Sequence, residues 1–147
     1  MFTLADYGSF SNALRIVERQ LQSAPDNFAA LANKGSLLIL SGDFSNAIPP
    51  FTRSLAVTNS YGARLGRAKA YLQIGRLDAA EADYQELRRA FPAAYRACFW
   101  LGDIAWQKKD TNAAIRYYQQ YLSNTVARSE EVRIAAARLK SLQQSRN

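Results

Sequence analysis

One residue pattern recurs along nearly the whole chain and limits the folds that are available to it. Four alanines, Ala13, Ala47, Ala80 and Ala114, follow one another at steps of 34, 33 and 34 residues. Other residues keep the same phase: glycines at 8, 42 and 75 precede their alanines by five positions, and Val17, Phe51, Tyr84 and Tyr118 follow by four. A period near 34 is typical of stacked helix-turn-helix units. Because one such unit cannot bury its apolar faces alone, neighbouring units must stack into an all-α solenoid.

The residues in phase also have a recognisable chemistry. Small residues recur in the first helix of each unit at Gly35, Ala68 and Gly102, and prolines close two units at Pro25 and Pro92. The stretch from Asn33 to Ile48 matches best. Together these residues resemble the tetratricopeptide repeat (TPR) family over roughly residues 1–125. The resemblance implies a right-handed α-solenoid of stacked hairpins with a C-terminal capping helix.

The repeat phase divides one TPR-like domain, 1–147, into a partial first repeat and three full repeats. The predicted boundaries are 1–27, 28–60, 61–94 and 95–128, with a capping helix and tail at 129–147. Because Met1 falls inside the pattern, the first repeat supplies mainly its second helix, with the turn at Gly8. We therefore expect seven main helices and a covering helix. The fourth turn departs from the family pattern, since Lys109 and Thr111 stand where glycine and an aromatic residue are usual.

Charge is distributed unevenly along the chain. The sequence has 19 basic and 12 acidic residues, a net charge of +7, and residues 1–60 contribute none of it. The basic residues are scattered among acids, which favours a solubilising surface over an acidic protein partner; nucleic acid is not expected as a ligand. No stretch is apolar enough for a transmembrane helix, and the N-terminus does not resemble a secretory signal. A cytoplasmic location is favoured, unless the chain is part of a longer envelope protein.

The sequence lacks the usual components of a catalytic or metal site. It has no histidine and a single cysteine, Cys98, in an apolar helical setting that indicates a buried thiol. We predict no enzyme activity, no cofactor and no metal. Carboxylates do gather between residues 78 and 86, at Asp78, Glu81, Asp83 and Glu86. Their neighbours Arg76, Arg88 and Arg89 favour a solvated, ion-paired face over an acid/base pair.

Function follows from the resemblance. The family binds peptides on a concave groove lined by the first helices, which implies a non-catalytic protein-interaction module or scaffold. Carried over position by position, the groove would present Asn33, Ser36, Leu65, Lys69, Gln73, Phe99, Asp103 and Trp106, together with Leu40. Phe99, Asp103 and Trp106 share one helix face, at i, i+4 and i+7, and could form an anchor pocket. The alternative is that the terminal helix covers Phe99 and Trp106 as core.

Local features give further expectations. Asp43 or Ser45 can cap the following helix, and Pro49 and Pro50 predict that this helix starts late or bends. Ser129 precedes two glutamates, as at the start of a helix. Since the first repeat is incomplete, apolar surface near Phe10, Leu14 and Val17 is expected to stay open. A missing upstream segment is favoured as its cover; otherwise a second copy covers it in a homodimer, or it is tolerated as a modest exposed patch. Self-assembly is therefore the alternative function.

Overall fold

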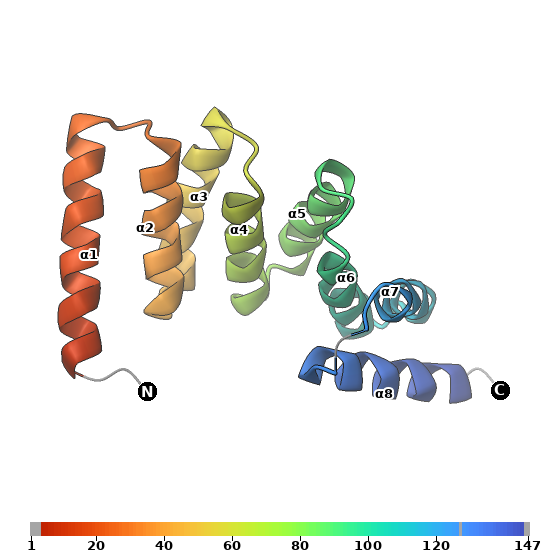
Figure 1. The fold of residues 1–147 in the computed structure, drawn as a ribbon. Coiled ribbons are helices and arrows are strands. Elements are labelled where there is room, and N and C mark those ends of the chain that lie inside the picture. Colours follow the sequence, from red (N-terminus) through yellow and green to blue (C-terminus); the bar gives the residue numbers. More distant parts are fainter. Residues whose placement is uncertain (1–3, 127, 146–147) are drawn as a thin grey trace. The chain divides into compact units, whose positions relative to one another are not determined.

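The chain folds entirely into α-helices over the residues that the computed structural model describes, 4–126 and 128–145. The helices in chain order (Figure 1) are α1 (Leu4–Ser23), α2 (Phe28–Leu40), α3 (Phe44–Val57), α4 (Tyr61–Gln73), α5 (Leu77–Ala90), α6 (Arg96–Gln107), α7 (Thr111–Ser123) and α8 (Glu130–Gln144). This confirms the predicted all-α repeat fold. A single helix comes first, three hairpins follow, and α8 is the expected covering helix.

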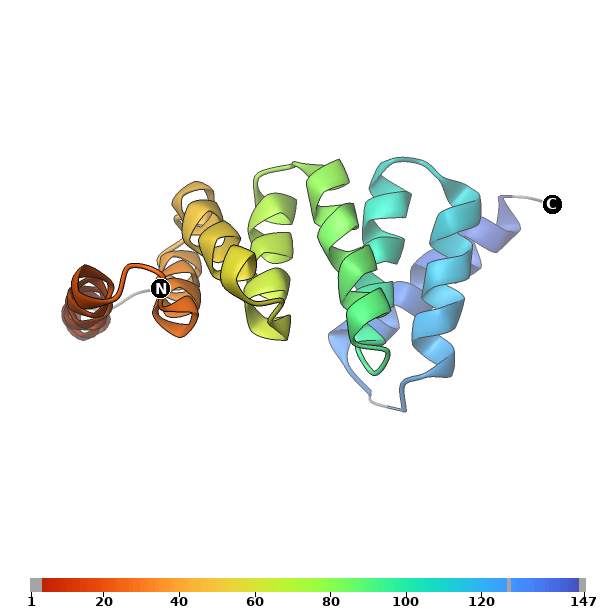
Figure 2. The ribbon, with the colours of Figure 1, turned by 90° about the horizontal axis from the view of Figure 1, so that it is seen from above.

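The chain divides into two compact units, Met1–Asp83 and Tyr84–Asn147. In the first unit α2 packs on α1, α3 and α4, and α3 packs on α4. In the second unit α6 pairs with α7, and α8 runs across both of them (Figure 2). Each helix of a unit therefore buries its apolar face against the next one in sequence, as a stacked repeat requires.

The turns inside the hairpins repeat the phase of the sequence. Gly42 and Gly75 both adopt positive φ, at 81° and 76°, and Lys109 occupies the equivalent place with φ of 60°. In two of these turns the following aspartate caps the next helix: Asp43 accepts from the Asn46 N–H and Asp110 accepts from the Ala113 N–H. The fourth turn therefore has the same backbone as the others, although lysine replaces the glycine that suits this conformation.

The first turn was predicted wrongly. Gly8 is in phase with Gly42 and Gly75, yet it lies inside α1, which continues without interruption from Leu4 to Ser23. In the second and third repeats the chain reverses at this glycine because the first helix of the repeat packs against the second. No such helix precedes α1 within the described residues, so the backbone simply stays helical.

Of the two caps predicted for α3, Asp43 and Ser45, the structure uses Asp43. Helix α3 begins at Phe44, directly after its Asp43 cap, and contains both Pro49 and Pro50 in its interior. The late start expected from the prolines does not occur. The N-cap bond and the burial of Pro50 favour the regular start. Ser129, by contrast, caps α8 as expected, accepting from the Val132 N–H.

The core of the first unit is built around the Phe51 ring. Phe51, Ala47 and Ala63 are fully buried, and the ring lies against two glycines, Gly35 of α2 and Gly66 of α4. A Cβ atom added at either glycine would lie within 2.8 Å of three ring carbons. The absence of side chains at these positions is therefore what lets α2 and α4 approach the same ring.

The core of the second unit is aromatic. Tyr118 and Tyr121 of α7 are buried with Phe99 of α6, whose ring lies 5.5 Å from Tyr121 and 4.9 Å from Trp100. Cys98 is 4% exposed, which confirms the predicted buried thiol. Burial raises the pKa of this thiol, so it remains protonated near neutral pH.

Candidate functional site

The sequence-predicted binding residues of the first unit lie on two helices that touch. Asn33 and Ser36 on α2, and Lys69 and Gln73 on α4, are exposed, whereas Leu65 is partly buried. None of the four exposed side chains contributes to the core. The structure thus brings these side chains onto a pair of adjoining helices and leaves them free for contact with a partner.

Apolar surface accompanies these polar groups. Leu40, at the end of α2, is 61% exposed, and Tyr61, at the start of α4, is 41% exposed. We call this surface, comprising Asn33, Ser36, Leu40, Lys69 and Gln73, the α2/α4 face. Its helices are fixed by the Phe51 ring beneath them, so the face is preformed.

The three residues predicted as an anchor pocket in the second unit have different environments. Phe99 is 3% exposed and belongs to the aromatic core, which makes it a core residue, the alternative left open by the sequence. Trp106 is 43% exposed, and the Asp103 side chain is 14% exposed. Only Asp103 and Trp106 remain on the surface, one turn apart on α6.

Asp103 and Trp106 are joined by an arginine that no sequence pattern singled out. Arg138 of α8 forms an ion pair with Asp103, and its guanidinium carbon lies 4.1 Å from the centre of the Trp106 ring. The same guanidinium donates to the Tyr118 hydroxyl at 3.0 Å. Burial acts to lower the pKa of Arg138, but hydrogen bonds with Tyr118 and Asp103 outweigh it and leave that pKa raised. Arg138 therefore stays charged.

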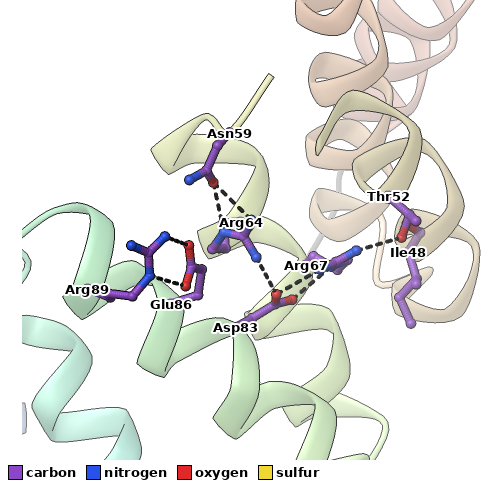
Figure 3. Close-up of polar contacts among 8 residues, drawn as sticks. All are labelled: Ile48, Thr52, Asn59, Arg64, Arg67, Asp83, Glu86 and Arg89. Carbon is purple, nitrogen blue, oxygen red and sulfur yellow. Dashed lines mark hydrogen bonds and ion pairs between the residues drawn. The ribbon is translucent and has the colours of Figure 1, made fainter. Parts of the chain in front are cut away.

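A second polar cluster, also missed, lies inside the first unit. Asp83 is 3% exposed, and its carboxylate accepts from two arginines of α4 (Figure 3). Arg67 makes a bidentate contact at 2.8 Å for each bond, and Arg64 donates at 3.0 Å. Outer hydrogen bonds run from Arg67 to Thr52 and from Arg64 to Asn59. The bonds with Asp83 raise the pKa of Arg67, so the cluster carries two positive charges on one buried carboxylate.

This cluster corrects the expected environment of Asp83. The sequence placed Asp83 on a solvated face with Arg76, Arg88 and Arg89 as neighbours. Of the acids in that stretch, Glu86 does pair with Arg89 at 2.5 Å, near the surface. Asp83, however, is buried and pairs with two arginines of α4, Arg64 and Arg67.

The burial expected at equivalent positions of the other repeats could have indicated this cluster. Arg64 is in phase with Leu31 and Cys98, which are both buried, and Arg67 is in phase with buried Leu101 and with Lys34, whose side chain is 31% exposed. An arginine at a core position requires a buried acid, because an unpaired charge there is costly. The candidate acid was already in the sequence one helix later.

The N-terminal end is less open than predicted. Val17 is 7% exposed, packed by α2, and Phe10 and Leu14 are partly buried. A cleft of about 390 Å³ remains in the first unit; its lining includes Leu14 and Leu21 of α1, Leu31 and Leu38 of α2, and Pro49 of α3. On the outer side of α1, Ile16 is 56% exposed.

Among residues 4–126 and 128–145, no cluster of three or more Cys, Asp or Glu side chains has an arrangement that could hold a metal ion. Nor does any helix in the described part of the chain combine the length and apolarity needed to cross a bilayer.

Comparison with known proteins agrees with the repeat geometry. Residues 65–130 match the tetratricopeptide repeat family model. The chain is 28% identical over 87 residues to DnaJ homolog subfamily C member 3 of Mus musculus, and 30% identical over 106 residues to Protein CTR9 homolog of Arabidopsis thaliana. These matches cover 58% and 71% of this chain but only 17% and 10% of those proteins, so the chain spans a small part of their length.

Solved structures show the same fold. A tetratricopeptide repeat protein from Parabacteroides merdae has a TM-score of 0.82 at 22% identity, covering 96% of this chain and 56% of its own. YrrB, described as a TPR protein with an unusual peptide-binding site, has a TM-score of 0.80 at 12% identity, covering 98% of this chain and 74% of its own.

Helical hairpins repeating every 33 or 34 residues, with the same turn and the same core alanine, define an α-helical repeat protein. Within that class, residues 65–130 match the tetratricopeptide repeat family, and 96% of the chain shares the fold of a solved tetratricopeptide repeat protein.

Proposed function

We propose that the chain is a non-catalytic interaction module that binds a peptide segment or partner helix on the α2/α4 face. The observation that carries this proposal is the set of exposed polar side chains on two contacting helices, none of which the fold needs for its core. A surface that is already ordered loses little conformational entropy on binding. The peptide-binding description of YrrB, which has the same fold, supports the proposal.

The chemistry of the face suits an extended or helical peptide with mixed polarity. Asn33, Ser36 and Gln73 can donate and accept hydrogen bonds to peptide groups, Lys69 can pair with a carboxylate, and Leu40 offers an apolar contact. Lys69 is the cationic group on this face, and it makes an acidic residue in the partner favourable at that point.

Substitution of Lys69 tests the proposal directly. A partner would be isolated by affinity capture and identified, and its dissociation constant measured by calorimetry. We expect Lys69→Ala to weaken binding by about 1 kcal/mol, roughly fivefold, with no change in unfolding midpoint. Arg19→Ala on α1 is the matched control, because it removes the same charge from another exposed surface of the same unit. Equal affinities for the wild type and both variants would place the binding surface elsewhere.

The alternative is self-assembly through α1, as an element of a larger complex. The exposed Ile16 on the outer side of this helix favours it. Light scattering over a hundredfold range of concentration would detect a dimer, and Ile16→Glu should dissociate it. A constant monomer mass would exclude this alternative for the chain.

A further inference from the structure

The guanidinium of Arg138 contacts three chemically different side chains, all from α6 and α7: Asp103, Trp106 and Tyr118. We call these three side chains the seat of the guanidinium. The Asp103 carboxylate supplies the negative charge, with its other oxygen accepting from Gln107 at 2.9 Å. The Trp106 ring lies against the flat face of the cation at 4.1 Å, and the Tyr118 hydroxyl accepts a third contact at 3.0 Å.

These three side chains favour a guanidinium over other charged or neutral groups. A planar cation can stack on an indole and still direct its edge N–H groups to a carboxylate and a phenol. A lysine ammonium is a compact point charge and cannot do both with the same geometry. A neutral side chain would leave the Asp103 carboxylate, which is 14% exposed, without a charged partner.

The occupant and the seat belong to different elements. Asp103 and Trp106 are on α6 and Tyr118 is on α7, and these two helices form their own hairpin. Arg138 is on α8, where Ala135 is the one fully buried residue among those described. The rest of the α8 contact is made by partly buried side chains such as Val132 and Leu139. The three side chains of the seat therefore come from α6 and α7 alone, whereas α8 is also held by Glu131, which accepts from Arg96 of α6 at 3.2 Å and from Tyr121 of α7 at 3.2 Å.

We propose that the Asp103–Trp106–Tyr118 seat is a binding site for an arginine side chain of a partner peptide, and that Arg138 is its built-in competitor. This inference rests on the proposed interaction function and names the chemistry that one of its subsites recognises. A partner arginine would replace the Arg138 guanidinium with the same set of contacts, and α8 would lose one of its contacts with α6 while its Glu131 contacts remain. Affinity for the partner would then depend on how often Arg138 leaves the seat.

The second unit as a whole opposes a basic ligand at long range. Residues 84–147 contain eleven basic and five acidic residues. Attraction must therefore come from short-range contacts in the seat. The dissociation constant should depend less on salt concentration than it would if long-range electrostatic attraction drove binding. Because residues 84–147 carry a net positive charge, an arginine flanked by apolar or acidic residues should bind better than a polybasic segment.

The test uses the whole chain and small probes. Nα-acetyl-arginine amide is titrated into the wild type and into Arg138→Gln, with the Trp106 indole N–H followed by NMR at constant ionic strength. We expect the dissociation constant to fall by about tenfold or more in Arg138→Gln, as it should when occupied seats outnumber open ones by roughly ten to one. The neutral isostere Nα-acetyl-citrulline amide should bind neither protein.

Two controls keep the result specific. Arg133→Gln removes a charge from the same helix at an exposed position paired with Glu130, and should bind the probe as the wild type does. Asp103→Asn combined with Arg138→Gln should abolish the gain. If Arg138→Gln does not fold, titration of the wild type is sufficient: the arginine probe, unlike the citrulline probe, should displace the Arg138 Nε–H signal and speed amide exchange in α8.

The inference is overturned if folded Arg138→Gln binds the arginine probe no more tightly than the wild type, if the citrulline probe binds equally well, or if the wild-type titration moves neither signal. Because the probe does not involve Lys69, any of these results would leave the proposed α2/α4 face intact. Loss of Lys69-dependent partner binding, in turn, would not affect the titration.

Discussion

The contact between Phe51 and Gly66 gives the sharpest prediction about stability. An alanine Cβ at position 66 would lie within 2.8 Å of three carbons of the ring, whereas carbon atoms normally pack about 3.5–4.0 Å apart. The ring is fully buried, and Gly35 lies against it as well, so it cannot move away from α4 without meeting α2.

The magnitude follows from two opposing terms. Overpacking of a closed core costs about 1–3 kcal/mol, and this site belongs at the upper end because the ring is held on both sides. Replacing a helical glycine by alanine returns about 1 kcal/mol. We therefore expect Gly66→Ala to destabilise the chain by about 2 kcal/mol.

Gly62 provides the matched control in the same helix. A Cβ added there meets no atom within 4 Å, so Gly62→Ala should stabilise the chain by about 1 kcal/mol through helix propensity alone. Urea unfolding followed by circular dichroism at a common m-value would measure both changes. In addition, Phe51→Leu combined with Gly66→Ala should be less destabilised than the sum of the single variants. Equal stability of the two alanine variants, or strict additivity of the double variant, would refute the packing argument.

Three other predictions concern single positions. Lys109→Gly should stabilise the chain by about 0.5–1 kcal/mol in urea unfolding, because glycine is unstrained at positive φ. Lys108→Gly, at φ of −75°, should destabilise it. A loss of stability in both variants would argue against the turn geometry. Asp83→Ala should cost about 3–5 kcal/mol in the same assay, since it leaves two guanidinium groups inside the first unit without their counter-ion, and a change below 1 kcal/mol would mean that water solvates them. Cys98 should react with a thiol reagent at pH 8 on the order of a hundredfold more slowly than a cysteine peptide, because burial raises its pKa and blocks access, and the rate should rise to the peptide value in denaturant.

Much of the fold could be predicted because it depends on residues that recur in phase. The core alanines Ala47, Ala80 and Ala114 are all fully buried, as the period required. The Lys109 turn shows that phase is more informative than residue type, since the backbone there adopts positive φ without glycine. Gly8 shows the limit of the same reasoning: a glycine in phase makes a turn only where there is a preceding helix to turn back from.

The candidate site was less predictable because side-chain partners come from distant positions in the sequence. Exposure of Lys69 and Gln73 follows from helix periodicity alone. Pairing of Asp103 with Arg138, 35 residues away, depends on how α8 crosses α6, and no local pattern determines that crossing. Phe99 and Trp106 lie on the same helix face, but only the placement of neighbouring helices decides that one is core and the other is half-exposed.

The weak attachment of α1 has a consequence for local unfolding. This helix has 20 residues, yet Val17, at 7% exposure, is its one buried residue among positions 8–23, and its cross-helix ion pair, Glu18 with Lys34, is solvated. Within the described residues α1 packs on α2 alone, so it can detach without disturbing the contacts among the other helices. Amide hydrogens of α1 should therefore exchange through openings of lower free energy than those of α2 and α3. Each opening would uncover Leu31 and Leu38, and the chain would briefly present the kind of apolar surface from which aggregation begins.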